Sequence, residues 1–128
     1  MSADDINGLY ILIIDDEQDF ACTLASRLEL RGARALCSFN GEDGLARIKE
    51  ELPDVVLLDM RMPGLSGLEV LERIRLEHVD LPVVVVSGHC SQHDRDSAED
   101  LGVLAFHPKP LQFRELLATI APLRGRRG

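Results

Sequence analysis

The stretch from Tyr10 to Asp16 is YILIIDD, in which five apolar residues end at two aspartates. Two later stretches have the same form: VVLLD at 55–59 and VVVVSG at 83–88. Short apolar runs bounded by polar or turn residues are typical of strands that are buried on both faces. Such strands belong to parallel sheets whose two faces are covered by helices. The sequence therefore predicts an α/β fold around a parallel sheet.

Amphipathic segments alternate with the apolar runs along the whole chain. We expect strands at 10–14, 33–37, 55–58, 83–86 and 104–106, and helices at 20–30, 41–52, 68–77, 92–101 and 111–121. This alternation predicts one doubly wound (βα)5 domain with right-handed crossovers. The helix at 92–101 has only Ala98 and Leu101 as clearly apolar residues, so we expect it to be weakly anchored.

The chain length of 128 residues fits one domain, which we place at 1–123. Residues 124–128, RGRRG, are basic and are expected to form a flexible tail or the start of a linker. A net charge of −8 disfavours direct binding to nucleic acid or to a membrane surface.

Cysteine usage and hydropathy bear on the compartment. The three cysteines form no C-x-x-C pair, and the N-terminus lacks the pattern of a secretory signal. The apolar runs are too short to span a bilayer. We therefore expect a cytoplasmic protein without disulfides.

Polar groups of complementary charge follow four of the five predicted strands. Asp15 and Asp16 follow the first, Asp59 the third and Ser87 the fourth, and Lys109 comes just after the fifth. In an open parallel sheet, ligands bind beyond the carboxyl ends of the strands, so these side chains are expected to converge.

Three converging aspartates repel one another, and a hard divalent cation would remove that conflict. Mg²⁺ prefers oxygen ligands and often bridges carboxylates to phosphate oxygens, and Mn²⁺ can substitute for it. The alternative is that the aspartates only cap the helices that follow them. That alternative suits a single aspartate better than the whole set.

Four segments in this order resemble the receiver domains of bacterial two-component (phosphorelay) response regulators. They are IIDDE at 13–17, VLLDMRMPG at 56–64, VVSG at 85–88 and Lys109-Pro110. The resemblance covers about residues 9–123. It implies the flavodoxin-like strand order 2-1-3-4-5.

The resemblance also implies roles at the site. Asp59 is then the phosphoacceptor, Lys109 pairs with a phosphoryl oxygen, and Ser87 bonds another. Asp16 is a direct Mg²⁺ ligand, with Asp15 close by or acting through water. Asp59 and the backbone carbonyl of Arg61 complete the protein ligands.

Further implied features concern signalling. Phe106 is the switch aromatic that moves with Ser87, while Arg61 and His89 lie beside the phosphoryl group and tune its lifetime. The Lys109-Pro110 bond is expected to be cis.

The implied function is a phosphoacceptor switch rather than a turnover enzyme. Its donor is a sensor histidine kinase or a phosphotransfer protein. The outer face of the fourth helix, fifth strand and fifth helix would control an output domain or partner, and could also form a homodimer. No membrane contact and no direct nucleic-acid binding are expected.

Three other functions fit the sequence less well. A phosphatase with an aspartyl-phosphate intermediate usually has a second aspartate where this chain has Arg61. A flavodoxin-like cofactor binder would have a hydroxyl- and glycine-rich loop where this chain has DDEQD at 15–19. A zinc site at His89, Cys90 and His93 has no second ligand pair.

Overall fold

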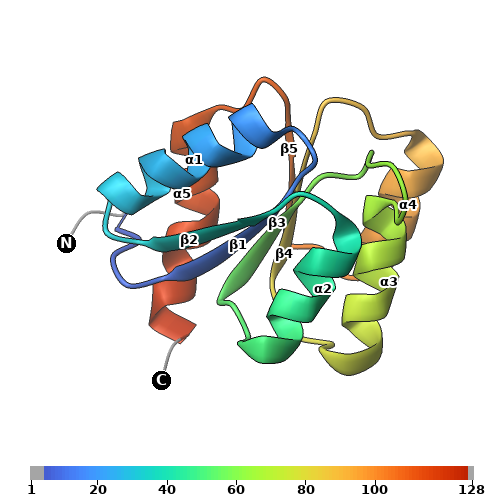
Figure 1. Ribbon diagram of the computed structural model, residues 1–128, viewed down its shortest axis with the longest axis horizontal. Coiled ribbons are helices and arrows are strands. Elements are labelled where there is room, and N and C mark those ends of the chain that lie inside the picture. Colours follow the sequence, from blue (N-terminus) through green and yellow to red (C-terminus); the bar gives the residue numbers. More distant parts are fainter. Residues whose placement is uncertain (1–4, 127–128) are drawn as a thin grey trace.

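The computed structural model describes residues 5–126, and the chain forms five strands and five α-helices in strict alternation (Figure 1). In chain order these are β1 (Tyr10–Ile14), α1 (Gln18–Leu30), β2 (Arg34–Ser38), α2 (Gly41–Glu50), β3 (Val55–Leu58), α3 (Gly67–Glu77), β4 (Val83–Ser87), α4 (Gln92–Asp100), β5 (Ala105–Pro108) and α5 (Phe113–Ile120). A 3-10 helix, η1 (Ala121–Arg126), follows α5.

The strands form one parallel sheet in the order β2-β1-β3-β4-β5, which confirms the predicted fold class and strand order. Every residue of β1, β3 and β4 is buried, whereas the edge strands β2 and β5 are partly exposed. The uninterrupted apolar runs in the sequence therefore mark the three central strands.

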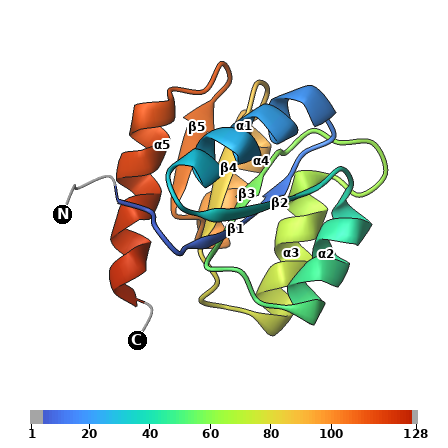
Figure 2. The ribbon, with the colours of Figure 1, turned by 60° about the vertical axis from the view of Figure 1, so that its left-hand side comes forward.

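Helices cover both faces of the sheet, and each layer has its own core. Figures 1 and 2 show α1 and α5 on one face and α2, α3 and α4 on the other. One cluster of buried side chains joins α1 and α5 to the sheet through residues such as Leu28 and Leu116. The second cluster joins α2, α3 and α4 to the opposite face through residues such as Ile48 and Leu71.

Several element boundaries differ from the expectation by a few residues. Helix α2 ends at Glu50 instead of residue 52, because Pro53 disfavours a helical conformation for the residue before it. Strand β5 begins at Ala105, while Leu104 is 47% exposed, and it runs on to Pro108. Helix α5 accordingly begins later than expected, at Phe113.

Helix α4 buries only Ala98, which agrees with its polar sequence, but both of its ends are held. At the N-terminus, the hydroxyl of Ser91 accepts a hydrogen bond from the backbone N–H of Asp94 at 3.1 Å. At the C-terminus, Arg75 of α3 donates hydrogen bonds to the carbonyl oxygens of Leu101 (2.6 Å) and Gly102 (3.3 Å). The helix is thus poorly buried along its length but fixed at its ends.

The C-terminal segment forms a 3-10 helix that begins inside the predicted domain and extends past residue 123. Helix η1 continues to Arg126, and the guanidinium of Arg124 pairs with the carboxylate of Asp5 at 2.6 Å. Residues 127–128 of the expected flexible tail lie outside the described residues. Within the described part of the chain, no helix has the length and apolar character that crossing a bilayer requires.

Candidate functional site

The predicted site residues converge at the carboxyl edge of the sheet. Asp15 follows β1, Asp59 follows β3 and Ser87 ends β4, and their exposed fractions are only 2%, 4% and 8%. Backbone pairing continues past the strands, since the N–H of Asp15 donates to Ser38 O and that of Asp59 donates to Ile14 O, each at 3.0 Å. The sheet itself therefore positions both carboxylates.

Lys109 reaches this pocket from the loop after β5. Its ammonium lies 2.8 Å from Asp15 Oδ2 and 3.7 Å from Asp59 Oδ2, and it also contacts the carboxylate of Glu17. The ammonium stands 4.4 Å from the centre of the Phe20 ring, at the start of α1. The Lys109-Pro110 peptide bond is cis, as predicted.

Burial and charge act in opposite directions on these groups. Burial raises the pKa of Asp15, and the neighbouring Asp59 charge raises it further, against the lowering effect of Lys109. For Lys109, burial lowers the pKa, but hydrogen bonds to Asp15 and Glu17 outweigh it, so the net pKa is above the ordinary value. Lys109 therefore remains charged at neutral pH and offsets only part of the acidic charge around it.

Two donors fix the carboxylate of Asp59. The hydroxyl of Ser87 lies 3.0 Å from Asp59 Oδ1 and also 3.0 Å from the carbonyl oxygen of His89, so its single proton can serve either acceptor. The backbone N–H of Arg61 donates to the same Oδ1 at 3.2 Å. Oδ1 thus faces hydrogen-bond donors, while Oδ2 faces the ammonium of Lys109.

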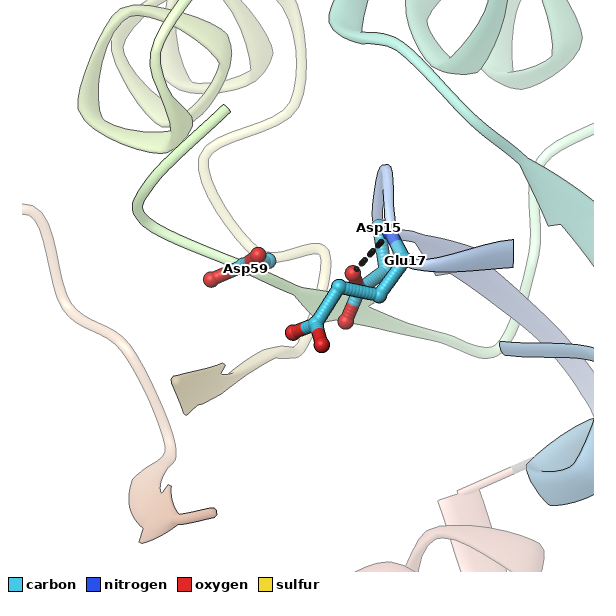
Figure 3. Close-up of side chains that lie close together, drawn as sticks. All are labelled: Asp15, Glu17 and Asp59. Carbon is cyan, nitrogen blue, oxygen red and sulfur yellow. Dashed lines mark hydrogen bonds between the residues drawn. The ribbon is translucent and has the colours of Figure 1, made fainter. Parts of the chain in front are cut away.

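The acidic cluster differs from the expected one in its third member. Among residues 5–126, Asp15, Glu17 and Asp59 offer carboxylate oxygens that all lie within 4.8 Å of one another. Figure 3 shows the three carboxylates gathered in one place, with the backbone N–H of Glu17 bonded to Asp15 Oδ1 at 2.9 Å. Asp16, expected to be the direct metal ligand, is half-buried and is not part of this group.

The donor set suits a hard divalent cation. Its three carboxylates and the one ammonium of Lys109 leave two formal negative charges in a largely buried pocket. Carboxylate oxygens are the ligands that Mg²⁺ prefers. The residues present therefore fit the predicted magnesium site.

The predicted signalling residues lie next to the site. Phe106 on β5 is half-buried and is stacked against the guanidinium of Arg95, 4.3 Å from the ring centre. Phe106 and Ser87 line the same cavity of about 250 Å³. Arg61 and His89 are exposed beside Asp59 and Ser87.

Glu17 is the site residue that sequence reasoning missed. It directly follows Asp15-Asp16, so the signal was a third acidic residue after β1. The contact between Arg95 and Phe106 was also not predicted. Arg95 lies on a polar helix, and its position in the sequence gave no indication that it would stack on this ring.

Comparisons with known proteins agree with this geometry. Residues 11–121 match the family model of the response regulator receiver domain. The transcriptional regulatory protein YkoG of Bacillus subtilis (strain 168), described as uncharacterized, is 39% identical over 111 residues, which are 87% of this chain and 49% of that protein. The chain thus spans about half the length of that curated relative.

Solved structures show the same likeness. A CheY-like response regulator receiver domain protein from Methanospirillum hungatei JF-1 superposes with a TM-score of 0.88 at 26% identity, covering 95% of this chain and all (100%) of that one. A DNA-binding response regulator of the LuxR family from Staphylococcus aureus gives a TM-score of 0.79 at 33% identity, over 90% of this chain and 98% of that one.

Proposed function

Because this chain belongs to the response regulator receiver domain family of two-component signalling, we propose that it is a switch that accepts a phosphoryl group on Asp59. The observation that carries the proposal is the contact of one buried carboxylate, Asp59, with a hydroxyl on one oxygen and an ammonium near the other. Receiver domains pair with histidine kinases and output domains, so the donor proposed here is a histidine kinase or a phosphotransfer protein.

The proposed reaction needs little from the protein beyond position and charge. An oxygen of Asp59 attacks phosphorus, the new O–P bond forms, and the bond from phosphorus to the donor breaks with its electron pair leaving on the donor. Lys109, already 3.7 Å from Asp59 Oδ2, is placed to neutralise a phosphoryl oxygen. The hydroxyl of Ser87 can turn from Asp59 to a second phosphoryl oxygen.

A magnesium ion fits the same pocket. Asp15 and Asp59 would hold it together with Asp16 or Glu17 and the backbone carbonyl of Arg61. When bound, it would offset negative charge on the phosphoryl oxygens. Glu17 enters this proposal because its carboxylate lies within the cluster, whereas that of Asp16 is not part of it.

The output of the switch is proposed to be the surface formed by α4, β5 and α5. Movement of Ser87 toward the phosphoryl group would displace the loop before α4, and Phe106 borders the cavity next to Ser87. In this scheme the chain catalyses only its own phosphorylation and dephosphorylation.

The test is the mass of the intact protein after incubation with acetyl phosphate and Mg²⁺. We expect a gain of one phosphoryl group, lost when a chelator removes the metal during the reaction. Asp59→Asn should abolish the gain, because the amide is a poor nucleophile.

Asp100→Asn is the matched control, since it removes an exposed carboxylate at the end of α4 and should leave the gain intact. A phosphoryl group that persists in Asp59→Asn would overturn the assignment of the acceptor.

A further inference from the structure

Two cysteines lie on the neighbouring elements α1 and β2, outside the acidic cluster. Cys22 is exposed on α1, and Cys37 is half-buried on β2. The sulfur of Cys37 donates a hydrogen bond to the carbonyl of Ala21, the residue before Cys22, at 3.4 Å. Cys22 also helps to raise the pKa of the Cys37 thiol, as a neighbouring sulfur would. The sequence, with fourteen residues between them and no C-x-x-C pair, did not indicate this pairing.

We propose that Cys22 and Cys37 form a redox-active pair that a hydroperoxide oxidises to a disulfide joining α1 to β2. A disulfide requires the sulfurs to approach to about 2.05 Å. The contact of Cys37 Sγ with the carbonyl of Ala21 places the Cys37 side chain beside the residue that precedes Cys22, from which rotation of the two side chains would bring the sulfurs together. Reversible bonds of this kind are the ones found in reducing compartments. The proposal does not depend on phosphorylation of Asp59.

The order of the reaction follows from exposure. Cys22 is open to solvent, so a peroxide reaches it first. Burial, together with the neighbouring Cys22, raises the pKa of Cys37 to about 11, so that thiol stays protonated at neutral pH and is the slower to be oxidised directly. Cys37 is therefore the resolving thiol.

The steps balance with hydrogen peroxide as the oxidant. The thiolate of Cys22 attacks one peroxide oxygen and breaks the O–O bond, which gives a sulfenic acid and releases water after proton uptake. The sulfur of Cys37 then attacks the sulfur of Cys22, the S–S bond forms, and the S–O bond breaks. The hydroxyl leaves as water with the proton of Cys37, so two thiols are oxidised and one peroxide is reduced to water.

The position of the pair links it to the phosphoacceptor pocket. Two residues before Cys22, Phe20 lies under the ammonium of Lys109. Ser38 directly follows Cys37, and its carbonyl oxygen accepts a hydrogen bond from the backbone N–H of Asp15. A disulfide would therefore tie together the two segments that flank Asp15.

The test uses reduced protein treated with a few equivalents of hydrogen peroxide and then with a thiol-alkylating reagent. We expect the monomer to lose two hydrogens and to take up one alkyl group instead of the three that the reduced protein takes up, and dithiothreitol should restore all three. A tryptic digest should contain Cys22 and Cys37 in one cross-linked peptide pair, since Arg27, Arg31 and Arg34 separate them.

The third cysteine supplies the matched control. Cys90→Ser should retain the loss of two hydrogens, whereas Cys22→Ser should abolish it, and the exposure of Cys22 means that this variant should fold normally. A disulfide through Cys90, a cross-linked dimer, or oxidation of Cys22 to sulfinic acid with Cys37 still free to alkylate would each overturn the proposal.

Discussion

Gly67, which has no side chain, allows the start of α3 to lie close to the proposed acceptor. A β-carbon at this position would lie 2.2 Å from the carbonyl oxygen of Asp59 and 2.5 Å from Cα of Met60. Both are backbone atoms, so Gly67→Ala must displace the segment that carries Asp59. We expect a loss of about 1–3 kcal/mol in the free energy of unfolding, measured by urea denaturation, and slower phosphorylation by acetyl phosphate.

Gly125→Ala is the control, because a β-carbon there meets no atom within 4 Å. Equal effects of the two substitutions would show that the close contact at Gly67 is unimportant.

Individual site residues could be predicted where a strand determines their place. Asp15, Asp59 and Ser87 follow or end strands with clear apolar patterns, so the sheet alone brings them together. The choice between Asp16 and Glu17 depends on how the loop after β1 turns its side chains. In the structure the carboxylate of Glu17 contacts Lys109, which lies 92 residues later in the chain, and local sequence gives no indication of such a contact.

Helix α4 shows what local pattern does and does not reveal about an element. Its polar sequence correctly predicted little burial, but its C-terminal anchor comes from Arg75 on α3. Arg75 donates to carbonyls at the ends of both helices and before β4: His78 at 2.9 Å, Leu81 at 2.8 Å, Leu101 at 2.6 Å and Gly102 at 3.3 Å. We call this set of four hydrogen bonds from Arg75 the clamp. Its four carbonyl groups come together only in the folded chain, so local sequence cannot predict it.

Removing the clamp should loosen α4 before it loosens the sheet. Arg75→Leu leaves four carbonyl groups without this donor, and we expect a loss of about 2 kcal/mol in the free energy of unfolding. Hydrogen exchange should accelerate most at the amides near Leu101. Arg73→Leu, an exposed change on the same helix, should leave exchange in α4 unchanged. If the two variants accelerate exchange equally, the clamp does not anchor α4.

At the scale of the whole molecule, the proposed site residues lie at one edge of a sheet whose two faces are packed with apolar side chains. Both helix layers meet the sheet through apolar side chains, so polar contacts at the carboxyl edge are the links that can rearrange without unfolding the core. This layered arrangement followed directly from the alternating pattern in the sequence. The coupling proposed between the edge and the outer face rests instead on contacts between β4, β5 and α4, which the alternating pattern does not specify.

That coupling can be tested across the molecule with beryllofluoride, a mimic of the phosphoryl group, and Mg²⁺. Ser87 donates a hydrogen bond to Asp59 and lines the cavity that Phe106 also lines, and the guanidinium of Arg95 of α4 stacks on the Phe106 ring. We expect amide signals in NMR spectra to shift at Ser87 and Lys109 and also along α4 and β5, while those of α2, on the far side of α3, stay in place. Asp59→Asn should remove both sets of shifts together, because one event at the acceptor drives them. Shifts that stop at the pocket and leave α4 and β5 unchanged would mean that the surface does not respond to the site, even if Asp59 accepts the phosphoryl group.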